Sequence, residues 1–166
     1  MNNKKIKFGV VGVGYLGKHH VKHLAKFDFV DLVGIYDVNK GLMQEVSSAY
    51  NVPSMESLNE LLKKVDAVSI VTPTKNHFEV ADKALNQGCH IFIEKPISNS
   101  IESSNSILNK VTKKNKVAHI GHIERFNPAF KSFMEQNHKP LFLECHRLTK
   151  INNRSMDISV VLDLMI

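Results

Sequence analysis

Three glycines near the N-terminus have the spacing of a phosphate-binding loop. Gly12, Gly14 and Gly17 form a G-x-G-x-x-G pattern directly after the apolar run of residues 6–11. In such a loop the first glycine permits a tight turn, the second lets the backbone approach a pyrophosphate, and the third lets the next helix pack closely. That helix would add free N–H groups and the positive end of its dipole. The pattern predicts a dinucleotide site that includes the intervening Tyr15 and Leu16.

An aspartate lies where the ribose of a bound adenosine would be recognised. Asp37 follows Gly17 by 20 residues and ends a second apolar run. A carboxylate in this position accepts hydrogen bonds from both ribose hydroxyls. It would repel the 2′-phosphate of NADP, and only Lys40 is near enough in the sequence to compensate. We therefore expect NAD as the cofactor, although Asp37 could also, or instead, cap the next helix.

A second group of reactive residues is Glu94-Lys95-Pro96, which follows the apolar run of residues 90–93. By itself this tripeptide fits an exposed turn that forms a salt bridge. Its position directly after a predicted strand, at the edge where ligands bind such sheets, also allows a functional role, which the family resemblance given below specifies.

Short apolar runs alternate with amphipathic segments over most of the chain. We expect strands over residues 6–11, 31–36, 67–71, 90–93 and 117–121. We expect helices after Gly17 and over residues 40–50, 58–63, 77–87 and 100–114, and Gly88 in the left-handed position that closes the fourth. The alternation predicts an α/β fold: a Rossmann-type doubly wound parallel sheet with helices on both faces. Ligands bind such sheets at the carboxyl ends of the strands. The residues directly after the predicted strands include Gly12, Asp37, Thr72, Glu94 and Gly121.

The pattern changes towards the C-terminus. After Pro128 we expect a helix to about residue 136, and residues 141–148 alternate like a strand of a different sheet. We place a domain boundary within residues 127–139. The expected organisation is a dinucleotide-binding domain over residues 1–127, followed at 128–166 by a linker helix and the incomplete start of an α+β second domain.

Composition excludes several classes of protein. The chain has 166 residues, a net charge of +6 and 43% hydrophobic residues. Its lysines are scattered and not interleaved with stacking aromatics, so we expect no nucleic-acid partner, whereas an anionic nucleotide would benefit from the positive field. The N-terminus is neither a signal peptide nor a membrane span, and Cys89 and Cys145 fit reduced thiols. We expect a cytoplasmic protein with no membrane partner.

No metal-binding pattern is present. The nine histidines form no H-E-x-x-H or related motif, and hydride transfer needs no metal. Three of them fall on the first predicted helix, where we expect packing or surface positions: His19, His20 and His23.

Taken together, these motifs resemble the Gfo/Idh/MocA family of oxidoreductases over essentially the whole chain. The resemblance is carried by the glycine loop, Glu94-Lys95-Pro96, Thr72-Pro73-Thr74, His77, and Ala84-Leu85 before Gly88. It implies that Lys95 meets the substrate hydroxyl beside the nicotinamide, and that Pro96 is often cis and fixes the direction of that lysine. It also implies that Thr72, Pro73, His77 and Glu94 belong to the cofactor site.

Within the family, two segments are similar to the branch of UDP-N-acetylglucosamine 3-dehydrogenases. They are residues 121–128 and the tail, residues 157–166. That branch oxidises the sugar 3-hydroxyl with NAD, ahead of amination to a diamino sugar of lipid A. The resemblance implies a sugar-nucleotide substrate, and many relatives carry Asn where this chain has Ile123.

Three arginines are candidates for binding that substrate. Arg125 is either structural or substrate-facing. Arg147 and Arg154 are either surface cations or ligands of the diphosphate, because guanidinium groups bind phosphate in a bidentate way.

The tail matches the first half of a family motif, Asp-x-x-x-His, whose histidine is the usual acid/base partner of the lysine. Asp163 matches the aspartate, and Ile166 is the last residue. We therefore expect a truncated chain that is inactive in isolation. Two alternatives stay open: a non-catalytic NAD-binding remnant of a disrupted gene, or a basic interaction domain without a cofactor. We expect a homo-oligomer or association through the C-terminal segment, with residues 141–166 either disordered or packed against another copy.

Overall fold

The computed structural model describes residues 4–136, 139–146 and 159–164. Its centre is a sheet of five parallel strands in the order β2-β1-β3-β4-β5. The strands are β1 (Ile6–Val11), β2 (Val30–Tyr36), β3 (Ala67–Ile70), β4 (His90–Glu94) and β5 (Ala118–Gly121). From β1 the chain first winds towards β2 and then continues on the other side with β3. The carboxyl ends of β1 and β3 therefore flank the switch point of the sheet, as expected for a doubly wound Rossmann-type fold.

Helices connect the strands in the predicted order. They are α1 (Tyr15–Leu24), α2 (Lys40–Tyr50), α3 (Leu58–Leu62), α4 (His77–Asn86) and α5 (Ile101–Lys113), with a 3₁₀ turn η1 (Thr74–Asn76) before α4. The predicted bounds of β1 and α2 are confirmed at both ends. Gly88 follows α4 with φ +82°, as predicted for the residue that ends this helix.

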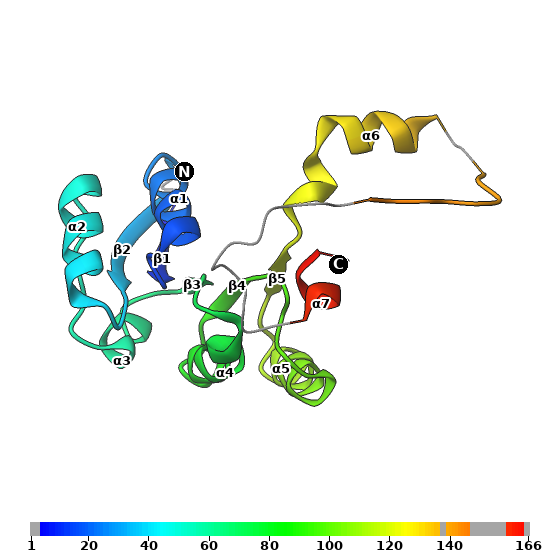
Figure 1. The fold of residues 1–166 in the computed structure, drawn as a ribbon. Helices are drawn as coiled ribbons and strands as arrows, with labels where there is room; N and C mark the ends of the chain where they lie inside the picture. The colour runs from blue at the N-terminus through cyan, green and yellow to red at the C-terminus, as the bar shows by residue number, and fades with distance from the viewer. Residues whose placement is uncertain (1–3, 137–138, 147–158, 165–166) are drawn as a thin grey trace.

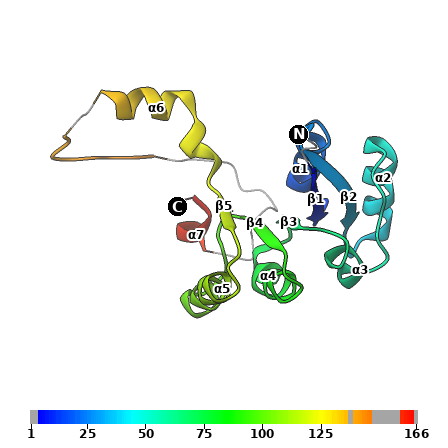
Figure 2. The same cartoon turned by 180° about the vertical axis from the view of Figure 1, so that it is seen from behind.

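The sheet has a separate apolar core on each face. On one face Val10 and Ile35 pack with Val21 of α1 and with Met43 and Val46 of α2. On the other face the strands pack against α3, α4 and α5, whose buried members include Leu61, Leu62, Ala81, Leu85 and Ile107. Figures 1 and 2 show α4 and α5 together on one side of the sheet. Each buried aliphatic side chain contributes about 1.5–3 kcal/mol, so both layers hold the sheet rigidly.

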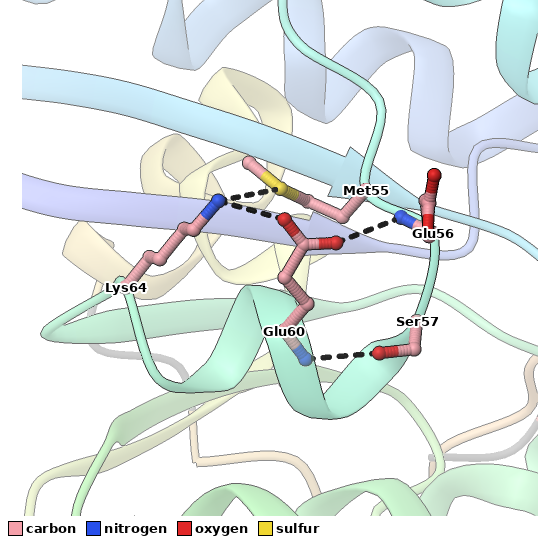
Figure 3. A network of polar contacts seen from close by, with 5 residues as sticks. All are labelled: Met55, Glu56, Ser57, Glu60 and Lys64. Carbon is pink, nitrogen blue, oxygen red and sulfur yellow. Dashed lines mark hydrogen bonds and ion pairs between the residues drawn. The ribbon is translucent and has the colours of Figure 1, made fainter.

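Hydrogen bonds to polar side chains fix the start of the short helix α3. Ser57 accepts a hydrogen bond from the backbone of Glu60, and the Glu60 carboxylate accepts one from the backbone of Glu56 (Figure 3). This S-x-x-E arrangement is a capping box, shifted by one residue on the return bond. Lys64 donates to Glu60 at 2.7 Å and to the sulfur of Met55 at 3.8 Å. The network joins α3 to the segment that leads from α2.

After β5 the chain leaves the sheet through η2 (Ile123–Phe126) and α6 (Pro128–Glu135). Asn127 caps α6 by accepting from the backbone of Ala129, and Pro128 occupies the first turn, where its missing N–H costs nothing. Figure 1 shows α6 and residues 139–146 standing away from the sheet. The predicted helix is confirmed within one residue.

Residues 141–146, which belong to the segment with strand-like alternation, are exposed and form no strand. Residues 147 and 148 lie outside the described part. A strand needs a neighbour for its backbone hydrogen bonds, and none pairs with this segment in the described structure. The last described element is α7 (Val160–Leu164). None of the described helices has the length and apolar character needed to cross a bilayer.

Candidate functional site

The three glycines of the loop after β1 meet different surroundings. Gly12 has φ +87°, and a Cβ there would lie 2.6 Å from the carbonyl oxygen of Val71. A Cβ on Gly17 would lie 2.0 Å from the carbonyl oxygen of Gly12. A Cβ on Gly14 would meet nothing within 4 Å. Gly12 and Gly17 are thus required by the fold itself, while Gly14 borders open space at the N-terminus of α1.

The groups around the glycine loop fit the pyrophosphate of a dinucleotide. The hydroxyl oxygen of Thr72, two residues beyond β3, is buried and has no hydrogen-bond partner among the described residues. A buried hydroxyl without a partner costs free energy, so a ligand that hydrogen-bonds here would relieve that cost. The first turn of α1 also presents backbone N–H groups that no side-chain cap satisfies. The glycine loop, α1 and Thr72 are therefore the groups that would hold the phosphates.

Asp37 joins the glycine loop to the end of β2. Its Oδ2 accepts from the backbone N–H of Val13 and its Oδ1 from that of Asn39, each at 2.8 Å. The cap of α2 is Asn39, which accepts from the backbone of Leu42, so the alternative that Asp37 caps this helix is wrong. A pocket of about 520 Å³ opens beside Asp37, with Lys40, Met43, Ser54 and Met55 in its wall.

Lys95 and Asp163 lie together at the end of β4, although 68 residues separate them. The Lys95 amine donates to the Asp163 backbone carbonyl oxygen at 2.5 Å and to its carboxylate Oδ1 at 2.8 Å. Both side chains are about one-third exposed, at 31% and 27%. This pair connects α7 to the edge of the sheet that carries the glycine loop. The Lys95-Pro96 peptide bond is cis, as the family resemblance implied.

The Glu94 carboxylate is held between a histidine and a glycine. Glu94 Oε1 lies 3.1 Å from Nε2 of His20, and the other ring nitrogen, Nδ1, lies 2.8 Å from the Ser69 hydroxyl. A Cβ on Gly121 would lie 2.6 Å from Glu94 Oε1, so the carboxylate rests against the bare backbone of β5. The sequence interpretation assigned His20 only to packing or the surface. Its position three residues after Gly17, on the helix face that packs against the sheet, is the signal that could have found it.

His77 links the loops that follow β3 and β4. The side chain is 1% exposed, with Nδ1 2.8 Å from the Pro96 carbonyl oxygen and Nε2 2.9 Å from that of Thr72. Both ring nitrogens are thus engaged with the backbone beneath the site. The cofactor contacts expected for His77 and for the exposed Pro73 stay predictions.

The remaining predicted residues are spread more widely. Tyr15 and Leu16 are exposed at the start of α1, at 68% and 37%. Arg125 is exposed on η2, where neighbouring Ile123 is 79% exposed. Arg147 and Arg154 lie outside the described residues. In the described part of the chain no three His, Cys, Asp or Glu side chains gather as a metal site would require.

The two cysteines differ in reactivity. Cys89 is buried under the sheet with its sulfur against the carbonyl oxygens of Leu62 and Val65. Burial raises the pKa of its thiol, which disfavours the reactive thiolate. Cys145 is exposed. Among the described residues, neither sulfur contacts the groups at the carboxyl edge of the sheet.

Comparisons with known proteins agree with this geometry. A family model described as an oxidoreductase family with an NAD-binding Rossmann fold, Gfo/Idh/MocA, matches residues 6–122. The chain is 38% identical over 162 residues to UDP-N-acetylglucosamine 3-dehydrogenase of Acidithiobacillus ferrooxidans, a match that covers 97% of this chain and 51% of that protein. It is 34% identical over 130 residues to scyllo-inositol 2-dehydrogenase (NAD(+)) of Bacillus subtilis, covering 76% and 38%.

Solved structures give the same result. The Acidithiobacillus ferrooxidans enzyme superposes with a TM-score of 0.88 at 38% identity, over 97% of this chain and 53% of that one. Scyllo-inositol dehydrogenase from Lactobacillus casei, solved with bound NAD(H) and scyllo-inositol, superposes with a TM-score of 0.75 at 29% identity, over 81% and 41%. The chain spans about half the length, or less, of these relatives.

Proposed function

This chain belongs to the Gfo/Idh/MocA family of NAD-binding oxidoreductases, and we propose that it is the dinucleotide-binding part of a dehydrogenase that oxidises the 3-hydroxyl of UDP-N-acetylglucosamine. The observation that supports this most is the row of groups along one edge of the sheet. Asp37, the glycine loop, Thr72 and Glu94-Lys95 follow β2, β1, β3 and β4 in spatial order. That row has the order of the parts of a dinucleotide: adenosine, pyrophosphate and nicotinamide.

At the adenosine end, Asp37 would select NAD. An ionised carboxylate has about four acceptor sites, and two of those of Asp37 are used by backbone N–H groups. The others are available to the two ribose hydroxyls. A 2′-phosphate beside the same carboxylate would be repelled, because two negative charges at such short range oppose each other.

At the nicotinamide end, NAD supplies the acceptor of the hydride that leaves the substrate carbon. Lys95 would hold the substrate hydroxyl there. In its neutral form the lysine amine has two donors and one lone pair. Asp163 takes both donors, so the lone pair is left to accept the hydroxyl proton as hydride leaves the carbon. Asp163 would fix the direction of that lone pair and stabilise the positive charge that Lys95 gains. Lys95 and Asp163 are accordingly the proposed catalytic pair.

The nature of the substrate is proposed from the similar enzyme of Acidithiobacillus ferrooxidans, which is named for UDP-N-acetylglucosamine. The net charge of +6 favours an anionic sugar nucleotide. Arg147 and Arg154 are the proposed contacts of its diphosphate, and Arg125 is proposed as a further substrate contact. We also propose that residues 1–127 form the nucleotide-binding domain and that residues 128–166 begin the part that contacts the substrate. The start of α6 at Pro128, away from the sheet, supports this division.

The proposal is tested by calorimetry of the purified chain with NAD(H) and NADP(H). We expect tighter binding of NAD(H). Asp37→Ala removes hydrogen bonds to a charged group, which contribute about 1.5–3 kcal/mol. This change should weaken NAD(H) binding about 10- to 100-fold and reduce the preference for NAD(H) over NADP(H). Asp31→Ala, an exposed aspartate near the other end of the same strand, is the matched control and should leave both affinities unchanged.

Equal affinity of the unmodified chain for the two dinucleotides would contradict the assignment. The same preparation should release little NADH when it is given UDP-N-acetylglucosamine and NAD. The described residues place no wall around the substrate beyond Lys95 and Asp163, and lost positioning alone can cost many orders of magnitude in rate. Rapid NADH release would show that the active site has been misplaced.

A further inference from the structure

A largely buried series of hydrogen bonds runs along the α1 face of the sheet to the proposed nicotinamide end of the site. It starts at the Ser69 hydroxyl in the middle of β3, passes through the His20 ring on α1, and ends at the Glu94 carboxylate. These are the residue types of a serine hydrolase triad, but Ser69 is 1% exposed and is enclosed between β1 and β4. No substrate reaches its oxygen. Glu94 is the open end of this series of hydrogen bonds, so any function of the series is exerted through its carboxylate.

Hydrogen-bond chemistry gives the direction of the chain. An ionised carboxylate only accepts, so Nε2 of His20 carries the hydrogen that lies between it and Glu94. In a neutral ring Nδ1 is then an acceptor, and the Ser69 hydroxyl donates to it. One neutral tautomer therefore satisfies every contact. The Glu94 carboxylate selects that tautomer, and the ring packs edge-on against Phe92, with centroids 5.5 Å apart.

The Glu94 carboxylate is consequently fixed in both position and rotation. His20 holds Oε1, and the bare Cα of Gly121 lies against both oxygens, where a Cβ would come within 2.6 and 2.9 Å of them. Both side chains of the pair are mostly buried, at 17% and 16% exposed. The acceptor sites of Oε2 are left for a ligand at the carboxyl edge of β4, one residue before Lys95.

We propose that His20, supported by Ser69, is a positioning residue that aims the Glu94 carboxylate at the carboxamide of the nicotinamide. The inference rests on the proposed function, because it needs a nicotinamide at the end of β4. The carboxamide NH₂ donates a hydrogen bond that an ionised carboxylate accepts. This contact sets which way the nicotinamide ring faces. His20 touches neither cofactor nor substrate and acts only through Glu94.

The test compares two ligands that differ only at the nicotinamide end. NADH binding is followed by the fluorescence of its nicotinamide, and ADP-ribose binding by calorimetry. In His20→Phe, which keeps an aromatic ring against Phe92 but cannot donate, NADH should bind about tenfold more weakly. ADP-ribose should bind within about twofold of the unmodified chain, since its contacts lie at the glycine loop and Asp37. His23→Phe, the same change on an exposed residue of α1, is the control and should alter neither.

A rescue variant separates a positioning role of His20 from a purely structural one. His20→Gln, whose amide can donate to Glu94, should recover most of the NADH affinity. If His20→Phe does not fold, Ser69→Ala replaces it and should weaken NADH selectively in the same way. Equal weakening of NADH and ADP-ribose, or unchanged NADH binding in a folded variant, would overturn this inference alone. Failure of the unmodified chain to bind either ligand would overturn the proposed function as well.

Discussion

The glycines of the phosphate-binding loop are identical in the sequence but not in what they do. Gly12 and Gly17 are packed against backbone atoms, so a side chain at either position would force the fold apart. Gly14 has negative φ, at −62°, and empty space around its Cβ position. The described packing therefore does not require glycine at this position, whereas the proposed pyrophosphate contact does.

This difference gives a prediction for Gly14→Ala. The variant should unfold within about 1 kcal/mol of the unmodified chain, because alanine fits this backbone conformation and loses only a modest capping preference. NAD(H) should bind at least about tenfold more weakly, since the methyl group occupies the space through which the pyrophosphate approaches. Chemical denaturation and calorimetry measure the two effects separately.

Gly17→Ala is the contrasting variant. Its Cβ would lie 2.0 Å from a backbone oxygen, so stability and binding should fall together. If Gly14→Ala bound NAD(H) normally, the pyrophosphate would have to lie elsewhere.

Residue-scale features were only partly predictable from the sequence. The glycine loop and Asp37 were proposed from their spacing after a strand, and Glu94-Lys95 from the family resemblance. The contact of His20 with Ser69 and Glu94 was not found, because it joins three elements across 49 and 74 positions and depends on how α1 sits on the sheet. Tertiary packing likewise determines which ring nitrogen of a histidine forms a given hydrogen bond.

At the scale of elements, α3 shows how a helix of five residues is maintained. Helices this short are unstable alone, but Leu61 and Leu62 are buried and the capping network of Figure 3 satisfies the first turn. The hydrogen bond from Lys64, and then that from the backbone of Glu56, lower the pKa of the Glu60 carboxyl. The cap is consequently strongest when Glu60 is ionised.

The cap should therefore contribute to stability in a pH-dependent way. Because the folded pKa of Glu60 is lowered, its contribution is complete above the ordinary glutamate pKa of 4.5 and is lost as the pH falls through the lower folded value. Glu60→Gln should be less stable than the unmodified chain at pH 7, and the difference should shrink below pH 4.5. Denaturant titrations at several pH values measure it.

Glu56→Gln provides the control, since Glu56 contributes only its backbone N–H to the network. This variant should show no such pH-dependent difference. A constant deficit of Glu60→Gln at every pH would show that the carboxylate charge plays no part in the cap.

The elements through residue 121 were predicted closely because each carries its own signal of period and end. Residues 141–146 differ, because their alternation is strand-like and yet they form no strand. A strand is not a property of one segment: it requires a partner strand, and pairing cannot be read from the alternating segment alone.

At the scale of the whole molecule, apolar side chains gather on the segments beyond the sheet. They are exposed on η2, α6, residues 141–143 and α7: Ile123, Phe126, Phe130, Met134, Leu141, Phe142, Leu143, Val160 and Val161. Soluble monomers seldom expose so many large apolar side chains on successive segments, and such exposure marks contact surfaces.

We therefore expect the isolated chain to associate with itself as its concentration rises. Phe142→Glu combined with Leu143→Glu should shift the chain towards monomer, because charges at side chains that are 80% and 68% exposed oppose burial in a contact. Leu108→Glu on α5, also exposed at 60%, is the control and should leave the association unchanged. Sedimentation velocity over a range of concentrations gives the result, and a strictly monomeric unmodified chain would refute the expectation.

The hydrogen bond from the Val13 backbone to Asp37 ties the choice of cofactor to the shape of the phosphate loop. Replacing this carboxylate with a small residue, in order to admit NADP, would also remove the hydrogen-bond acceptor that holds the loop in place. Such a change would therefore alter cofactor discrimination and affinity together. Asp37→Asn, which can keep an oxygen facing Val13 while giving up the negative charge, should disturb the loop less than Asp37→Ala does.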